Sequence, residues 1–355
     1  MSPLLPIPRG PLSRAVIDRL AGRPGTDATL TDPGGHLDRL DHAAALVDDD
    51  LHLALWCGYE LHHHGFAGVD DRLEWDPDLI RFRRCLEGVF EAALRAEAAA
   101  TPVPADPAGA LAALAERPSP PLASTVEAEA TLDQLREVAV HRSIYQLKEA
   151  DGHTFGLPRL RGPGRDAYVE IQMDEYGNGR TGHAHADLFA AALAELGLDP
   201  RLGGYLDRVP GTTLATDNLV ELFALNRRLR GALVGHLALF EVTSVVPMSR
   251  YLRAAQRLGG GRFPALERFY AVHVEADVHH GDLARTALVG GLLADEPDLA
   301  ADVVFGAVAL ANVEGRFADH LLRCWRRGDS SLLPAPADRP ASGPARLAVA
   351  AAAGG

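Results

Sequence analysis

Histidine and aspartate recur at helical spacing in the stretch FYAVHVEADVHHGD, residues 269–282. Each residue of a helix advances by about 100°, so His273, Asp277 and His280 fall within about 60° of one another on one face, whereas His279 points elsewhere. The rest of that face is apolar, and ionisable groups on a buried face need a partner or a cation. Imidazole and carboxylate together suit iron, manganese or zinc. The spacing therefore predicts a metal site, against the alternative of a solvated face or a hydrogen-bonded His/Asp network.

A site for two metal ions needs carboxylates from other helices, and the chain offers them. Glu241 stands in the apolar run LALFEVTS as a lone carboxylate on an apolar face. Glu149 lies on the apolar stripe of a helix predicted over 124–151, although Arg142 on the same stripe is an alternative ion-pair partner for it. Both carboxylates are predicted to contribute to the metal site.

The segment DEYGNGRTGHAH supplies two more donors. It places Glu175 at the end of a short helix and, after a glycine-rich break, it places His185 on an apolar stripe. A turn between two ligands lets both of them face one cavity. Asp174 and His183 are neighbours that spacing alone does not distinguish from Glu175 and His185.

All of these residues lie in or beside segments with helical periodicity. No segment shows a sustained two-residue alternation of β-branched residues, so the predicted fold class is all-α. Asp76 and Pro77 occupy the N-cap and first-turn positions of one predicted helix. The periodic runs are residues 42–64, 76–100, 124–151, 166–176, 183–196, 216–257, 263–292 and 297–326, with one short helix near 12–22.

The composition of the chain indicates which classes of molecule it binds. The 355 residues carry a formal charge of −13, and the chain has no block rich in Lys and Arg, which argues against nucleic acid or an anionic membrane as a partner. The three cysteines are widely spaced, the N-terminus lacks the pattern of a signal peptide, and no segment approaches the roughly 18 apolar residues of a membrane span. We therefore expect a cytoplasmic protein that acts on a small molecule.

Taken together, these residues resemble the ligand pattern of the haem-oxygenase-like diiron oxidases, whose actinobacterial members are called iron-containing redox enzymes. The interval between Glu149 and Glu175 also matches that between the first two ligands of this family, and the matching region covers residues 124–292. The resemblance implies a haem-oxygenase-like helical bundle that binds two Fe(II) ions, or a mixed Mn/Fe pair, and activates O2. The metal ligands that it implies are Glu149, Glu175, His185, Glu241, His273, Asp277 and His280.

The chain is longer than the matching region, and we expect three parts. Residues 1–120 are predicted to form an N-terminal helical extension and linker, and residues 121–328 the haem-oxygenase-like diiron domain. Residues 329–355, rich in Pro, Ala and Gly, are predicted to form a disordered tail. The extra N-terminal helices are expected to pack against the bundle or across the seam of a homodimer.

Glu60 and His63 have the Glu-x-x-His spacing of ferritin-like diiron proteins. The haem-oxygenase-like pattern is filled without them. We therefore interpret Glu60 as a buried carboxylate that is structural or supports the ligands from outside the direct ligand set.

The resemblance implies an oxidase or oxygenase that oxidises a small metabolite, by N-oxygenation or by oxidative fragmentation of an amino or carboxylic acid. Its partners would be O2, the substrate and, where the reaction requires one, an electron donor. Two different functions also fit the fold class. Metal-free members of the same superfold, such as thiaminase-like or cofactorless enzymes, would lack this ligand set, and a non-catalytic binding protein would use the His/Asp cluster for structure alone.

Overall fold

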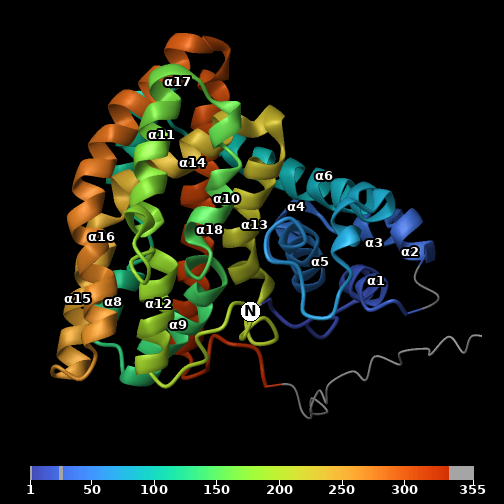
Figure 1. The fold of residues 1–355 in the computed structure, drawn as a ribbon, viewed down its shortest axis with the longest axis horizontal. Helices are drawn as coiled ribbons and strands as arrows, with labels where there is room; N and C mark the ends of the chain where they lie inside the picture. The colour runs from blue at the N-terminus through green and yellow to red at the C-terminus, as the bar shows by residue number, and fades with distance from the viewer. Residues whose placement is uncertain (1, 24–26, 336–355) are drawn as a thin grey trace, which may run out of the picture.

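The computed structural model describes residues 2–23 and 27–335, and every regular element in these ranges is helical (Figure 1). This confirms the all-α fold class. Most of the tail predicted at 329–355 lies outside the described ranges, which end at residue 335. The α-helices are α1 (Pro11–Leu20), α2 (Asp27–Thr31), α3 (Gly34–Leu37), α4 (His42–Ala45), α5 (Asp49–Glu60), α6 (Pro77–Ala99), α7 (Pro107–Glu116), α8 (Leu122–Ala128), α9 (Leu132–Gln146), α10 (Glu149–Thr154), α11 (Gly162–Glu175), α12 (His185–Glu195), α13 (Gly211–Leu225), α14 (Arg230–Thr243), α15 (Val245–Gly259), α16 (Pro264–Leu283), α17 (Gly290–Asp295) and α18 (Ala300–Arg326). A π-helical turn, η5 (Ala284–Val289), continues α16 into α17.

The start of α6 follows the predicted sequence signals. The Asp76 side chain accepts hydrogen bonds from the backbone N–H groups of Asp78 and Leu79, and Pro77 is the first helical residue. Such a cap satisfies backbone donors that have no partner within the helix. Within the part predicted as N-terminal helical extension and linker, residues 1–120, the structure forms α7, whose Leu111 is buried in the core.

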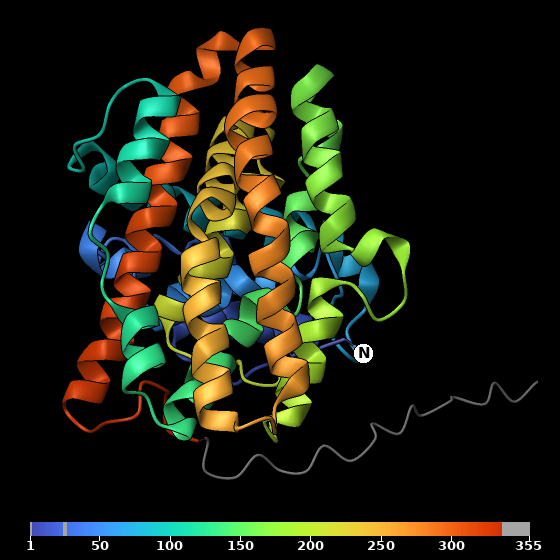
Figure 2. The same ribbon diagram turned by 90° about the vertical axis from the view of Figure 1, so that its left-hand side faces the viewer.

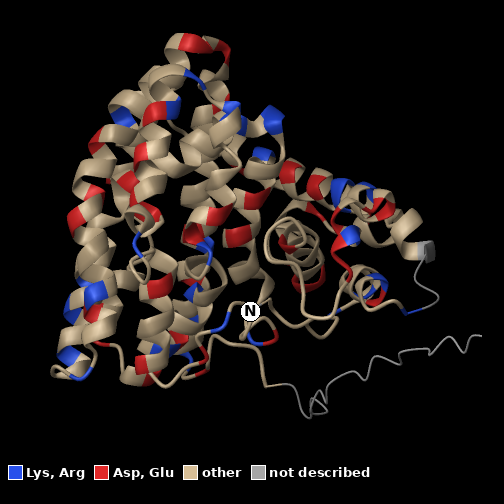
Figure 3. Cartoon of the chain, in the orientation of Figure 1, with Lys and Arg blue, Asp and Glu red and all other residues tan. Residues whose placement is uncertain are grey.

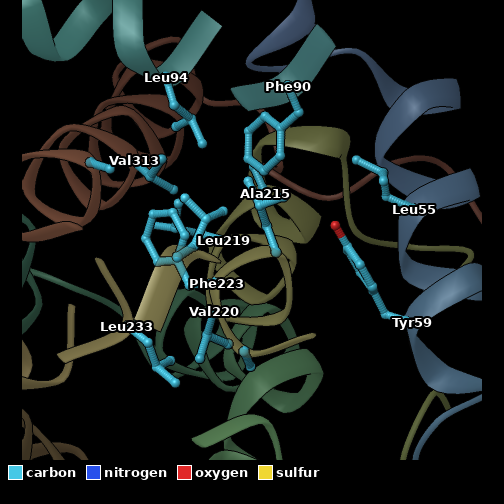
Figure 4. Close-up of a cluster of buried hydrophobic side chains, with 14 of the residues drawn as sticks. Leu55, Tyr59, Phe90, Leu94, Ala215, Leu219, Val220, Phe223, Leu233 and Val313 are labelled. Carbon is cyan, nitrogen blue, oxygen red and sulfur yellow. The ribbon is translucent and has the colours of Figure 1, made fainter. Parts of the chain in front are cut away.

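One apolar core joins the N-terminal helices to the bundle. Figure 1 shows α1 to α6 on one side of the molecule and the helices of the bundle on the other, with α13 between them. Helix α13 is buried along almost its whole length and packs against α5, α9, α10 and α18. Leu55 and Tyr59 of α5, Phe90 of α6, and Ala215 and Phe223 of α13 all belong to this core, and in Figure 4 Ala215 lies between the side chains of α5 and Phe223. The N-terminal helices therefore pack against the bundle of the same chain.

Helices α14 and α18 cross at very close range, and glycine permits this. A Cβ atom added to Gly235 would collide with the carbonyl group of Val303, and one added to Gly306 would collide with that of Ala232. This crossing fixes the depth of α14 in the bundle, and α14 carries one of the predicted metal ligands.

Three of the predicted helices are broken in the structure. The run 42–64 forms α4 and α5, the run 124–151 forms α8, α9 and α10, and the run 216–257 forms α13, α14 and α15. Pro247 explains why α14 ends at Thr243, because proline has no N–H to donate to the Thr243 carbonyl. No Gly or Pro lies between residues 132 and 151, so local sequence does not explain the break between α9 and α10.

Figure 2 shows the long helices of the bundle running side by side, and Figure 3 shows acidic and basic residues interspersed along them. Within the described ranges, no single helix has the length and apolar composition to cross a membrane. One bent pair, residues 227–243 with 245–259, meets those two criteria jointly.

Candidate metal centre

Six of the seven predicted ligands gather into two groups of three. We call the first the Glu149 group: helices α10, α12 and α16 bring together Glu149, His185 and His273. We call the second the Glu175 group: helices α11, α14 and α16 bring together Glu175, Glu241 and His280. Within each group, one ligand atom from each residue lies within 4.8 Å of the other two. Each group thus combines imidazole and carboxylate donors from three separate helices.

The two groups are in contact with each other. His185 Nδ1 of the Glu149 group lies 2.8 Å from Oε2 of Glu175. The rings of His185 and His273 also lie close, with their centroids 4.2 Å apart. Cations held by the two groups would therefore be neighbours.

Helix α16 presents its three predicted ligands to the interior. His273, Asp277 and His280 are all buried, whereas the side chain of His279 is 63% exposed and pairs with Glu170 at 2.8 Å. This is the arrangement expected from the angles around a regular helix. Asp277 belongs to neither group of three, but its Oδ1 lies 4.0 Å from His280 Nδ1.

Several of the predicted ligand atoms lack a hydrogen-bond partner among the described residues, although oppositely charged groups are near. Each of these ligand atoms is buried and lies near another predicted ligand. The atoms are Glu149 Oε2, Glu175 Oε2, His185 Nδ1, His273 Nε2, Asp277 Oδ2 and His280 Nδ1. Buried polar atoms are rarely left unpaired in proteins. Divalent cations between these atoms would satisfy them, and the donor set fits iron or manganese.

The electrostatics of the cluster also fit cation binding. Burial raises the pKa of Glu241 to about 7, with a further contribution from Asp277. Burial likewise raises the pKa of Asp277 to about 6. Burial acts to lower the pKa of His273, but Glu149 and Glu175 raise it to about 10. Without a cation the cluster therefore retains protons near neutral pH, and binding of a metal would release them.

In two of these histidines, the ring nitrogen that points away from the group contacts an oxygen atom of the protein. His273 Nδ1 donates to the carbonyl oxygen of Phe269 at 2.8 Å, which leaves Nε2 for a cation. His280 Nε2 lies 3.0 Å from Asp174 Oδ2, which leaves Nδ1 for a cation. Metal-binding histidines usually donate their other N–H to a carbonyl or carboxylate in this way. Asp174, which spacing did not distinguish from Glu175, therefore supports an imidazole from outside the two groups.

Three residues singled out in the sequence lie outside both groups. Two of them were near predicted ligands, and the third has a metal-binding spacing. His183 is exposed. Arg142 pairs with Glu314 through two contacts of 2.9 and 2.6 Å, so it is not the partner of Glu149. Glu60 is fully buried, and its Oε2 lies 3.3 Å from the Lys148 ammonium instead of joining either group.

Two polar residues that were not predicted from the sequence lie beside the predicted ligands. A small cavity of about 30 Å³ is lined by Glu149, Glu175 and Asp277, and also by His153 and Gln172. His153 Nε2 and Gln172 Oε1 are buried and have no hydrogen-bond partner in the described part of the chain. The spacing of Glu149 and His153, four residues apart on α10, was the available signal, because such residues share a helix face.

A much larger cavity, of about 780 Å³, adjoins the small one. Both cavities are lined by Tyr145, Phe240, Ser244 and Met248, so these residues form the wall between them. The rings of Tyr145 and Phe240 stack with their centroids 5.5 Å apart. The volume lies within the range of about 300–1,000 Å³ that is typical of small-molecule sites.

Known proteins offer three comparisons. A family model described as iron-containing redox enzyme matches residues 136–315, a range that includes every predicted ligand. A nitrosourea synthase from Streptomyces achromogenes subsp. streptozoticus is 26% identical over 132 residues, which are 37% of this chain and 28% of that protein. The chain therefore matches less than a third of the length of this curated relative. Crystal structures of a CADD-like protein of unknown function from Nostoc punctiforme are 17% identical, with TM-scores of 0.49 and 0.47; they align with 60% of this chain and with 94% and 91% of their own chains.

Proposed function

Because the chain belongs to the iron-containing redox enzyme family, we propose that it is a diiron oxidase or oxygenase that uses O2 to oxidise a small metabolite. The observation that carries this proposal is the pair of adjoining His/carboxylate groups, in which five of the six residues have a buried ligand atom without a hydrogen-bond partner in the described structure. One cation would be held by the Glu149 group and the other by the Glu175 group. The donors suit two Fe(II) ions or a mixed Mn/Fe pair.

The chain's own residues would set the geometry of this centre. The Phe269 carbonyl and Asp174 fix the orientation of His273 and His280, so that each imidazole directs one nitrogen into its group. Asp277 adds a further carboxylate between these two histidines along α16. When bound, the two ions would supply the activation of O2.

We place the substrate in the 780 Å³ cavity, because it shares a wall with the ligand cluster. Tyr145 and Phe240 would line the route of the substrate toward the ions. Charged residues also line this cavity, among them the ion pair of Arg142 and Glu314, and a charged amino or carboxylic acid would match such a lining. A nitrosourea contains oxidised nitrogen, so the similarity to nitrosourea synthase favours N-oxygenation over oxidative fragmentation.

The test is an anaerobic titration of chelator-treated protein with Fe(II), followed by addition of O2 and of candidate amines, amino acids and carboxylic acids. We expect two ions per chain and O2 consumption that depends on one class of substrate. His279→Ala is the matched control, because this residue is a histidine of the same helix that lies outside both groups. Absence of iron binding would favour a metal-free enzyme or a binding protein, and iron binding without substrate-dependent O2 consumption would refute the oxidase assignment.

A further inference from the structure

A second buried cluster of charged residues surrounds the ammonium group of Lys148. Its Nζ lies 2.8 Å from Glu221 Oε1, 3.1 Å from Asp217 Oδ2 and 3.3 Å from Glu60 Oε2. All four side chains are at most 1% exposed. The ring of Trp56 lies 5.4 Å from the same nitrogen. Three carboxylates and an aromatic ring thus enclose a single cation that the chain itself supplies.

The N-terminal helices contribute much of this cluster. Glu60 ends α5, and His63 follows it by one turn; His63 Nε2 lies 2.8 Å from Glu221 Oε2. His64 Nδ1 lies 3.0 Å from Glu60 Oε1. The Glu-x-x-His pair that resembled a metal motif therefore faces a lysine ammonium.

Lys148 stands at the unexplained break between α9 and α10. Its backbone is not helical, with φ −146° and ψ 29°, and the next residue, Glu149, begins α10. Because residues 132–151 contain no Gly or Pro, the local sequence favours a continuous helix through this point. The break therefore needs a tertiary cause, and the contacts of the buried ammonium provide one.

The first turn of α10 is also held from a second direction. A Cβ atom added to Gly152 would lie 3.4 Å from Glu221 Oε1 and 3.5 Å from the Val220 side chain, so α10 packs closely on α13 at this point. The backbone that carries Glu149 is thus fixed on both sides: by the ion cluster of Lys148 before it and by the contact at Gly152 after it.

We propose that Lys148 is a positioning residue for the metal centre: its ammonium, held by carboxylates of α5 and α13, fixes the break at which Glu149 is presented to the Glu149 group. The inference rests on the proposed function, since it concerns metal binding by that group. It also gives the N-terminal helices a role in the centre. Glu60 and His63 lie outside the matched range 136–315, yet Glu60 contacts Lys148 directly and His63 contacts its partner Glu221.

The test compares the metal affinity of variants by anaerobic calorimetry with Mn(II), which does not require turnover. Lys148→Met is expected to weaken one of two binding sites by about 10- to 100-fold, as removal of the partners of metal ligands usually does. Lys148→Arg, which keeps the charge, should recover most of that loss, and Glu60→Gln should weaken the same site to a smaller degree. In a Glu241→Gln background, where the Glu149 group alone remains complete, the weakened site is measured directly.

Leu55→Ala is the control for a general loss of stability. Leu55 is fully buried on α5 and carries no charge, so this variant is expected to lower the melting temperature without removing a charged member of the cluster. Two results would overturn the inference. Lys148→Met could bind both ions as tightly as the wild type does, or its affinity for both ions could fall in the same proportion as in Leu55→Ala. Should Lys148→Met fail to fold, Glu60→Gln decides by the same criterion. A wild-type chain that binds no Mn(II) or Fe(II) would instead overturn the proposed function, and this inference with it.

Discussion

Replacing His280 by alanine is expected to remove one metal ion, whereas replacing the adjacent His279 is expected to remove none. His280 is fully buried, with Nδ1 3.4 Å from Glu241 and Nε2 3.0 Å from Asp174. His279 lies on the exposed side of the same helix and pairs with Glu170. The two substituted residues are therefore neighbours in the sequence, but one is buried beside predicted ligands and the other is exposed to solvent.

The expected effect on thermal stability follows from linkage between binding and folding. An ion that binds only the folded chain stabilises it by about 2.7 kcal/mol when its free concentration is 100 times Kd, so two such ions give about 5.4 kcal/mol. Unfolding entropy of about 2.1 cal/mol/K per residue gives roughly 0.75 kcal/mol/K for 355 residues. The melting temperature should therefore rise by about 7 °C with two ions and by roughly half as much with one.

The assay is thermal unfolding followed by circular dichroism under anaerobic conditions, with and without Mn(II). The wild type and His279→Ala should both show the shift of two ions, and His280→Ala the shift of one. An equal loss in both variants would mean that side chains around residue 280 do not follow the faces of α16. An undiminished shift in His280→Ala would show that this imidazole binds no ion.

Three further predictions test the fold, the acid response and the cavity. Gly235→Ala should lower the free energy of unfolding by about 3 kcal/mol in urea titrations, because the added methyl group collides with the Val303 carbonyl; an unchanged value would show that α14 and α18 can separate freely. Burial lowers the pKa of His52 to about 3, so below about pH 6.5 the unfolded chain binds a proton that the folded chain does not, and stability should fall with pH by up to 1.36 kcal/mol per unit from this group. His52→Gln should reduce that slope in urea titrations of metal-free protein, and an identical slope would contradict the assignment. Met248→Trp should fill the wall between the two cavities and slow substrate-dependent O2 consumption by roughly 10- to 100-fold without changing the number of bound ions; unaltered turnover would place the substrate elsewhere.

Local periodicity by itself determined which faces of the helices carry chemistry. The angles around one helix were enough to put His273, Asp277 and His280 together on the buried side of α16 and His279 on the exposed side. The same reasoning identified Glu241 as a buried carboxylate on an apolar helix. These features depend only on the geometry of a regular helix, so a sequence contains them.

Only the tertiary structure decided how those faces meet. The division of the predicted ligands into two groups depends on which helices pack together, and no spacing along the chain encodes this. Asp174 and Glu175 are adjacent in sequence, yet one supports an imidazole and the other joins a group, because α11 ends between α12 and α16. The break before Glu149 is the clearest case, since the sequence around it favours a continuous helix. Its position is set by the buried ammonium of Lys148 and by carboxylates more than 60 residues away in either direction along the chain, whose contacts exist only when the fold is complete.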